Sequence, residues 1–142
     1  MSKIAVIGVG SPFGNDSIAY RTIECLKQEP DFRAHLHYYD RPGWYLLNCM
    51  KPFDTVHLVD AMISSKPPGT LYRYEDIHAF KHNQNLLSSH GFGLAETLLL
   101  GEALNELPTK LIIHGIEISL DSDAIECLGL VAQIKQEILN AI

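Results

Sequence analysis

Short apolar runs alternate with segments of helical spacing along this chain. Apolar, partly β-branched runs bounded by glycine or polar residues are typical of buried strands, and they cover residues 3–9, 55–60 and 110–118. A shorter strand is predicted over 36–40, and residues 70–74 alternate like an edge strand. Apolar residues at helical spacing predict helices over 18–29, 44–50, 92–106 and 124–142. The polar segment 75–85 gives no assignable pattern.

The order of these elements predicts the fold class. Strands that alternate with helices favour an α/β three-layer sandwich, with a mostly parallel sheet of about five strands and helices on both faces. A chain of 142 residues is long enough for one such domain, so we expect a single domain over 1–142. The apolar stripe of the last helix is predicted to comprise Ile125, Leu128, Val131, Ile134, Ile138 and Leu139.

Composition and charge exclude several classes of function. The net charge of −6 disfavours nucleic-acid binding, and no apolar stretch approaches the roughly 18 residues of a membrane span. The chain is too short for a complete dinucleotide-dependent dehydrogenase. The first residues do not resemble a signal peptide, and the three cysteines form no C-x-x-C pair. We therefore expect a cytoplasmic protein without structural disulfides.

Three carboxylates follow the first three predicted strands. Asp16 lies in the loop after the first strand, and Asp40 and Asp60 end the second and third. Ligands of parallel α/β sheets bind beyond the carboxyl ends of the strands, so these side chains are expected to face one crevice.

The glycine-rich loop after the first strand favours a cation over a phosphate. Its spacing is G-x-G-x-x-x-G from Gly8 to Gly14, one residue longer than the dinucleotide fingerprint, and Asp16 places negative charge where a phosphate would bind. Two alternatives stay open: a plain strand-to-helix turn with Asp16 or Asn15 as helix cap, and a small nucleotide-binding domain.

Asp60 and His90 complete a possible metal site. An acid at the end of a buried strand is costly unless it is paired or binds a cation, and His90 lies between Ser89 and Gly91 before a predicted helix. Helix capping by Asp60 and a purely structural His90 are the alternatives. Two carboxylates and one imidazole suit zinc or nickel, either as a catalytic metal or as a metal carried by a substrate.

The remaining histidines have simpler interpretations. His78 and His82, four residues apart, are expected on a solvated helix face, and His35 and His37 on an exposed strand. His114 lies in the strand 110–118 and is either a support for a ligand in the crevice or a buried, hydrogen-bonded residue.

Five motifs in order resemble the nickel–iron hydrogenase maturation proteases, endopeptidases that trim the C-terminal tail of the hydrogenase large subunit. The resemblance extends from residue 3 to about residue 140. The motifs are Gly8-x-Gly10-Ser11-Pro12-x-Gly14-Asn15-Asp16, Asp40-Arg41-Pro42-Gly43, Val59-Asp60-Ala61, Pro67-Pro68-Gly69-Thr70 and Ser89-His90-Gly91-Phe92-Gly93-Leu94.

The resemblance implies a metal-recognising endopeptidase that processes a nickel-loaded hydrogenase large-subunit precursor. It assigns Asp16, Asp60 and His90 as the catalytic and metal-binding residues. The nickel would be carried by the substrate, and zinc or cadmium could replace it in crystals. Without a one-residue gap in the first loop, Ser17 would take the place of Asp16.

The second loop is implied to read the substrate, through Asp40, Arg41 and Gly43. Asn15 replaces the first acid of the family's usual pair. This departure keeps open a non-catalytic, nickel-sensing binding module of the same fold. No nucleotide, nucleic-acid or membrane partner is expected.

Overall fold

The computed structural model of the chain describes residues 3–10, 18–30, 32–62, 66–67, 69–83, 93–117 and 127–141. Five strands form one sheet in the order β2-β1-β3-β5-β4. Four of them are parallel, and β4 pairs antiparallel with β5 at one edge. The strands are β1 (Ile4–Val9), β2 (His35–Tyr39), β3 (Thr55–Met62), β4 (Leu71–Tyr74) and β5 (Lys110–Glu117).

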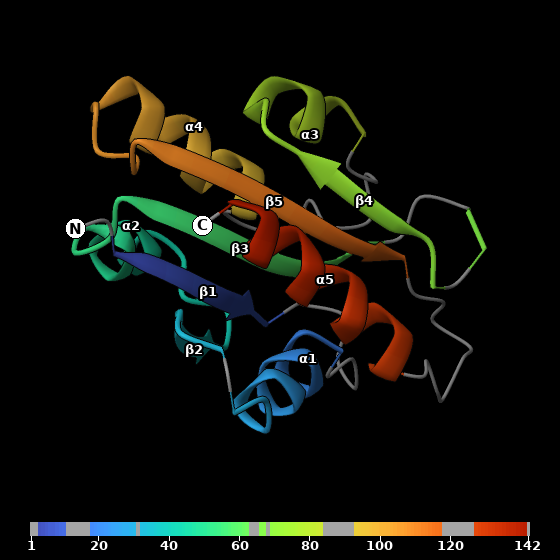
Figure 1. Cartoon of the computed structure of the whole chain (residues 1–142). Helices are drawn as coiled ribbons and strands as arrows, with labels where there is room; N and C mark the ends of the chain where they lie inside the picture. Colours follow the sequence, from blue (N-terminus) through green and yellow to red (C-terminus); the bar gives the residue numbers. More distant parts are fainter. Residues whose placement is uncertain are drawn as a thin grey trace.

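Helices cover both faces of this sheet (Figure 1). One face carries two helices and the other carries three, so the expected three-layer α/β sandwich is confirmed. The first face is covered by α1 (Ile18–Lys27) and α5 (Cys127–Ala141), and the second by α2 (Tyr45–Met50), α3 (Ile77–Asn83) and α4 (Leu94–Ala103). No helix in the described ranges is long and apolar enough to cross a membrane.

Two apolar cores fill the spaces between the layers. Alternate residues of β1 point to opposite faces: Val6 packs under α1 and α5, and Ala5 and Ile7 pack under the other helices. Continuous apolar runs are therefore what strands buried on both faces require. Phe80 of α3 is fully buried, although the polar segment around it gave no helical pattern.

Two details differ from the sequence expectations. β3 continues through Ala61 and Met62, which pair with Ile116 and Glu117 of β5, so Asp60 lies inside the strand and does not end it. Leu139 of α5 is 42% exposed, so it does not belong to the buried stripe of that helix, which includes Ile134 and Ile138.

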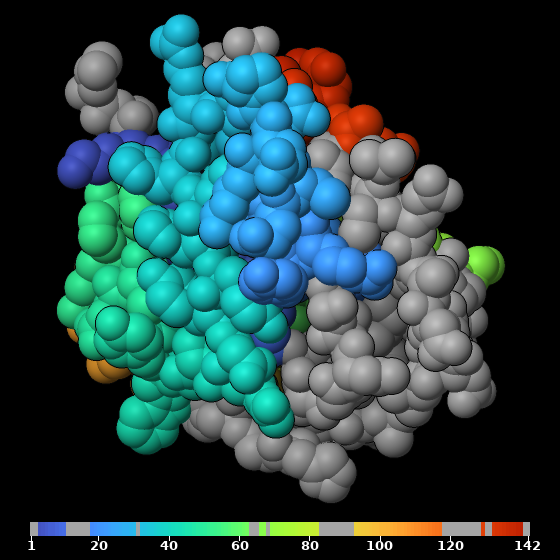
Figure 2. Space-filling model, turned by 90° about the horizontal axis from the view of Figure 1, so that it is seen from below, coloured from blue at the N-terminus to red at the C-terminus, as the bar shows by residue number. Residues whose placement is uncertain are grey.

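The two sheet edges differ in their surroundings. β4 is a four-residue strand that follows the turn at Gly69. β2 is the outer strand at the opposite edge, next to β1. Figure 2 views the molecule from this side, where the cyan segment containing β2 reaches the surface between α1 and α2.

Candidate functional site

The carboxyl ends of β1 and β3 flank the point where the chain changes direction across the sheet. From β1 the chain moves outward to β2, and from β2 it returns past β1 to form β3. The connecting helices α1 and α2 consequently lie on opposite faces, which opens a crevice at the strand ends in folds of this kind. Asp40 directly follows the last residue of β2, and Asp60 lies two residues before the carboxyl end of β3.

Asp60 is almost fully buried inside β3. It lies opposite Gly115 of β5 and is only 7% exposed. Its strand neighbours Leu58 and Met62, which share its face of the sheet, belong to the core under α2, α3 and α4. The strand therefore presents a carboxylate where desolvation strengthens its interaction with any positive charge that reaches it.

A second buried acid, Glu117, accompanies Asp60 on this face. Glu117 is 1% exposed and pairs with Met62, two positions beyond the Asp60–Gly115 pair. Its carboxylate accepts a hydrogen bond of 2.7 Å from the hydroxyl of Tyr72 on β4. The sequence analysis missed this residue, although an acid that follows Ile116 in an apolar strand is the same signal that singled out Asp60.

The first glycine motif is explained in part by close packing. A Cβ atom on Gly8 would lie 2.7 Å from Ile23 Cγ1 of α1, and a Cβ atom on Gly10 would lie 2.8 Å from Cα of Asp40. The Gly10 N–H also donates a 2.7 Å hydrogen bond to the carbonyl of Tyr39. These glycines let the end of β1 lie directly against α1 and the end of β2.

The turn after β2 places its polar residues at the surface. Arg41 has a φ of 48° and Gly43 a φ of 58°, so the backbone adopts the left-handed conformation twice within this turn. Arg41 Nε lies 3.4 Å from Asp40 Oδ1, and both side chains are more than 60% exposed. Such an exposed ion pair contributes little to stability, which leaves both groups available to a partner.

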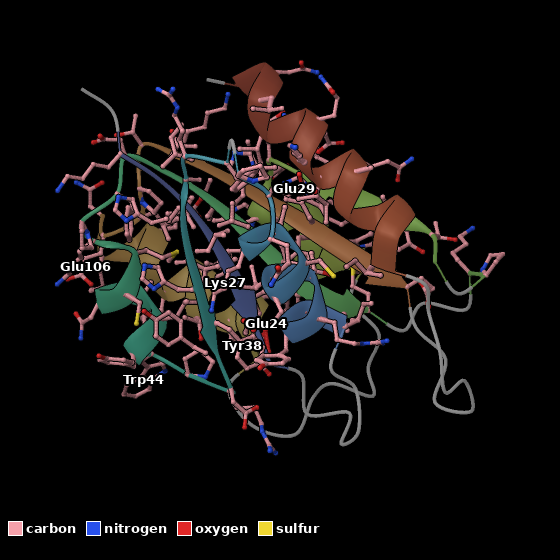
Figure 3. The ribbon with its side chains drawn as sticks, turned by 60° about the horizontal axis from the view of Figure 1, so that its bottom comes forward. Glu24, Lys27, Glu29, Tyr38, Trp44 and Glu106 are labelled. Carbon is pink, nitrogen blue, oxygen red and sulfur yellow. The ribbon has the colours of Figure 1, made fainter. Side chains whose placement is uncertain are left out.

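Two exposed aromatic residues follow this turn in the chain. Trp44 and Tyr45 are each 62% exposed at the start of α2. Figure 3 shows Trp44 at the surface beside α2, whereas Tyr38 of β2 lies toward α1. Exposed aromatic surface therefore follows Asp40 in the chain by four and five residues.

Asp16, its alternative Ser17 and His90 lie outside the described residues. Asp60, the third residue of the predicted metal site, lies inside β3, two residues before its last residue Met62. Within the part of the chain that the structure describes, no three His, Cys, Asp or Glu residues are grouped to hold a metal ion. The three-ligand site therefore stays a prediction.

A separate polar cluster lies on the other face of the sheet, under α5. His57 of β3 and His114 of β5 are 1% and 3% exposed, and His57 Nδ1 lies 2.9 Å from His114 Nε2. Their ring planes differ by only 14°. Because Asp60 lies on the opposite face, His114 is the buried, hydrogen-bonded histidine of the two alternatives and gives no support to a ligand beside Asp60.

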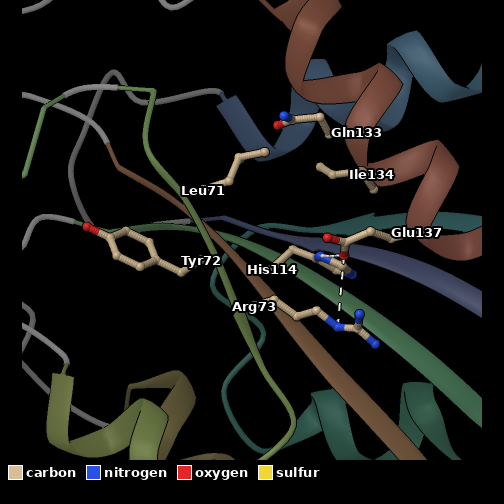
Figure 4. Close-up of a pocket in the computed structure, with 7 residues that line it drawn as sticks. All are labelled: Leu71, Tyr72, Arg73, His114, Gln133, Ile134 and Glu137. Carbon is tan, nitrogen blue, oxygen red and sulfur yellow. Dashed lines mark ion pairs between the residues drawn. The ribbon is translucent and has the colours of Figure 1, made fainter.

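The charge of Glu137 on α5 favours one direction for this hydrogen bond, although its Oε2 atom forms no hydrogen bond with a described residue. One of its carboxylate oxygens lies 3.2 Å from His114 Nδ1 and 4.0 Å from Arg73 Nε (Figure 4). The carboxylate favours a proton on His114 Nδ1, so the neutral His114 accepts at Nε2 and His57 donates from Nδ1. His57 Nε2 is then a buried acceptor, and no described residue forms a hydrogen bond with it.

Burial keeps both rings neutral. Desolvation, with a smaller contribution from the Arg73 charge, lowers the pKa of His57 from 6.5 to about 4. Desolvation and then the proximity of His57 lower the pKa of His114 to about 3. A pocket of about 60 Å³ beside His114, lined also by Arg73, Ile134 and Glu137, is large enough to hold water.

The exposure of the other histidines agrees with the predictions except at His37. On β2, His35 is exposed and His37 is partly buried. His78 and His82 are exposed on α3, and His78 Nε2 lies 3.0 Å from Glu102 Oε1. Cys25 and Cys49 are half-buried thiols that pack against the two cores, so they offer no nucleophile at the carboxyl end of the sheet.

Comparison with known proteins gives a consistent result. The family model for hydrogenase maturation protease (HycI) matches residues 41–142, more than half of the chain. The hydrogenase expression/formation protein HupD of Thiocapsa roseopersicina is 28% identical over 145 residues, which cover 99% of this chain and 64% of the relative. HoxM of Cupriavidus necator is 26% identical over 118 residues, covering 80% and 58%. The chain thus spans about three-fifths of the length of these curated relatives.

Solved structures share the fold. An endopeptidase from Escherichia coli, solved in solution, is 28% identical and superposes with a TM-score of 0.70, covering 98% of this chain and 91% of that one. The hydrogenase maturating endopeptidase HybD from E. coli has the same coverage, 24% identity and a TM-score of 0.69. The order of the elements, the carboxylates at the strand ends and the family match agree, and the chain belongs to the hydrogenase maturation protease family.

Proposed function

We propose that this protein is a cytoplasmic endopeptidase that removes the C-terminal extension of a nickel-loaded hydrogenase large-subunit precursor. One observation carries the proposal: in a chain of this family, Asp60 is a buried carboxylate at the carboxyl end of the central strand, where α/β folds bind ligands. The similarity to an E. coli endopeptidase at 28% identity supports the hydrolytic activity.

Nickel is the feature by which the enzyme recognises its substrate. The proposed ligands are Asp16, Asp60 and His90, a set of oxygen and nitrogen donors that suits nickel or zinc. The structure supports one member of this set, since a cation is the partner that a desolvated Asp60 side chain would favour. A precursor that lacks nickel would leave the three side chains without a shared ligand and would stay uncut.

Two routes could activate the water that attacks the peptide bond. The metal lowers the pKa of a bound water, or one carboxylate accepts its proton as a general base. In either route Asp40 and Arg41, which are exposed at the neighbouring turn, orient the substrate chain together with Gly43.

The second candidate function is a nickel-sensing module without protease activity. The observation in its favour is Asn15, which stands where the family's motif has the first of two acids. Such a module would bind the loaded precursor and leave it at full length.

One experiment separates these functions. Purified protein is incubated with nickel-loaded and with metal-free precursor, and the mass of the large subunit is measured. Shortening of only the loaded precursor supports the protease, and binding with no change of mass supports the module. If neither form is cut or bound, both proposals are wrong. Normal processing by Asp16→Asn, together with loss of processing by Ser17→Ala, would assign the first ligand to Ser17.

A further inference from the structure

The outer strand β2 leads directly into the proposed substrate-binding turn. Its last residue, Tyr39, is followed by Asp40. The carbonyl of Tyr39 accepts a hydrogen bond from the N–H of Gly10, so the backbone groups of Tyr39 face β1. Backbone groups alternate in direction along a strand, so those of His37 also face β1, and the N–H and C=O of Leu36 point away from it.

Within the described ranges of the chain, none of the usual devices that prevent strand pairing protects this edge. Natural edge strands are protected by proline, by lysine or other charges, by bulges or by a covering element. β2 reads His-Leu-His-Tyr-Tyr, and no other described strand pairs with its outer side. In Figure 2 this segment lies at the surface between α1 and α2.

Aromatic rings border the edge on the α2 side. The rings of His35 and His37 are parallel with centroids 6.5 Å apart, and those of His37 and Tyr39 are 6.1 Å apart. The ring centroid of Phe53 lies 6.0 Å from that of His37, and the ring centroid of Tyr45 lies 6.4 Å from that of Tyr39. Every second side chain of an added strand would thus contact an aromatic surface.

The α1 side of β2 offers a matching surface. Tyr20 of α1 is 45% exposed and packs edge-to-face on Tyr38, with centroids 5.2 Å apart. Leu36, partly buried, belongs to the same side. The edge therefore offers apolar contacts to both sets of alternating side chains of an extended peptide.

We propose that the C-terminal segment of the hydrogenase precursor binds as a sixth strand along β2. This inference rests on the proposed function, because the occupant is the peptide that the enzyme cuts. Main-chain hydrogen bonds would supply affinity and the two aromatic surfaces would select apolar side chains. Five residues of strand extend about 16 Å, and its carboxyl end adjoins Asp40, so a paired peptide is delivered to the crevice in an extended form.

The first test alters the backbone of the peptide. Synthetic copies of the precursor's C-terminal segment, each N-methylated at one position, compete with nickel-loaded precursor in the processing assay. Strand addition predicts a period of two: methylation of N–H groups that face β2 weakens competition about tenfold or more, and methylation of the intervening ones does not. Uniform effects along the segment would overturn the proposal.

The second test alters the edge of the enzyme. Leu36→Pro removes the outward N–H but keeps the inward ladder, whereas Leu36→Ala shortens the side chain and keeps the N–H. We expect processing by the proline variant to be about five- to tenfold weaker than by the alanine variant, with far-UV circular dichroism confirming that both fold. Equal rates in the two variants would refute strand addition.

The two proposals fail in different ways. If the unaltered protein does not cut the loaded precursor, the proposed function is wrong. If it cuts normally while the period of two is absent, only the strand addition is wrong. A stable dimer in sedimentation analysis that Leu36→Pro dissociates would identify a second copy of this chain as the occupant, which also overturns the proposal.

Discussion

Acidification from pH 7 to pH 5 is predicted to destabilise the protein through His57 and His114. Both rings are neutral in the folded state, where the pKa values are about 4 and about 3, against 6.5 in the unfolded chain. Below pH 6.5 the unfolded state therefore binds protons that the native state does not, and stability falls as the pH falls.

The size of the effect follows from the pKa depression. A pH of 5 is 1.5 units below the pKa of a histidine in the unfolded chain. Each ring therefore lowers the free energy of unfolding by about 2 kcal/mol, and the pair by about 4 kcal/mol. This is a large part of a typical unfolding free energy of about 5–15 kcal/mol. The loss continues until the pH reaches the folded-state pKa values, where the native rings begin to charge.

Urea unfolding followed by far-UV circular dichroism at pH 7 and pH 5 measures this loss. His57→Asn and His114→Asn should each reduce the pH-dependent difference by about 2 kcal/mol, whatever they cost at pH 7. His78→Asn is the matched control, because the side chain of His78 is 66% exposed. The reasoning is wrong if the unaltered chain is equally stable at both pH values, or if the control reduces the difference as much as His114→Asn does.

Three further substitutions test the carboxyl end of the sheet. Asp60→Asn should slow processing at least about hundredfold while the thermal midpoint stays within a few degrees, and normal processing would remove Asp60 from the site. Tyr72→Phe leaves buried Glu117 without its 2.7 Å hydrogen bond and should cost about 1–3 kcal/mol in urea unfolding, so an unchanged midpoint would argue against that bond. Gly10→Ala should destabilise the protein by about 1–3 kcal/mol, because the added methyl group overlaps Asp40. An unchanged free energy of unfolding would contradict the close packing of Gly10 against Asp40.

The fold could be predicted from the sequence because its strongest signals are local. The apolar runs of β1 and β5 and the helical spacing of α1 follow from burial on both faces of a parallel sheet. The helix α3 was not predicted because its seven residues are mostly polar and one side chain, Phe80, supplies its fully buried contact.

The site could be predicted only where chain order determines position. Asp40 and Asp60 follow from the rule for strand ends, whereas the role of His114 depends on Glu137, a residue brought close by the packing of α5. Asp60 was expected to end β3, but the strand continues because Ala61 and the next residue still pair with β5. A strand ends where it loses its neighbouring strand, and one polar residue does not end it.

The contact of Gly10 with Asp40 has a consequence for attempts to change the substrate of the proposed enzyme. Because a side chain at position 10 would collide with Asp40, the end of the segment that follows β1 and the start of the turn after β2 are packed as one unit. A change in the shape of the turn therefore has to be matched at Gly10. Libraries that vary only 40–43 would sample a narrow set of shapes, and the proposed specificity is best redesigned by varying Gly10 and 40–43 together.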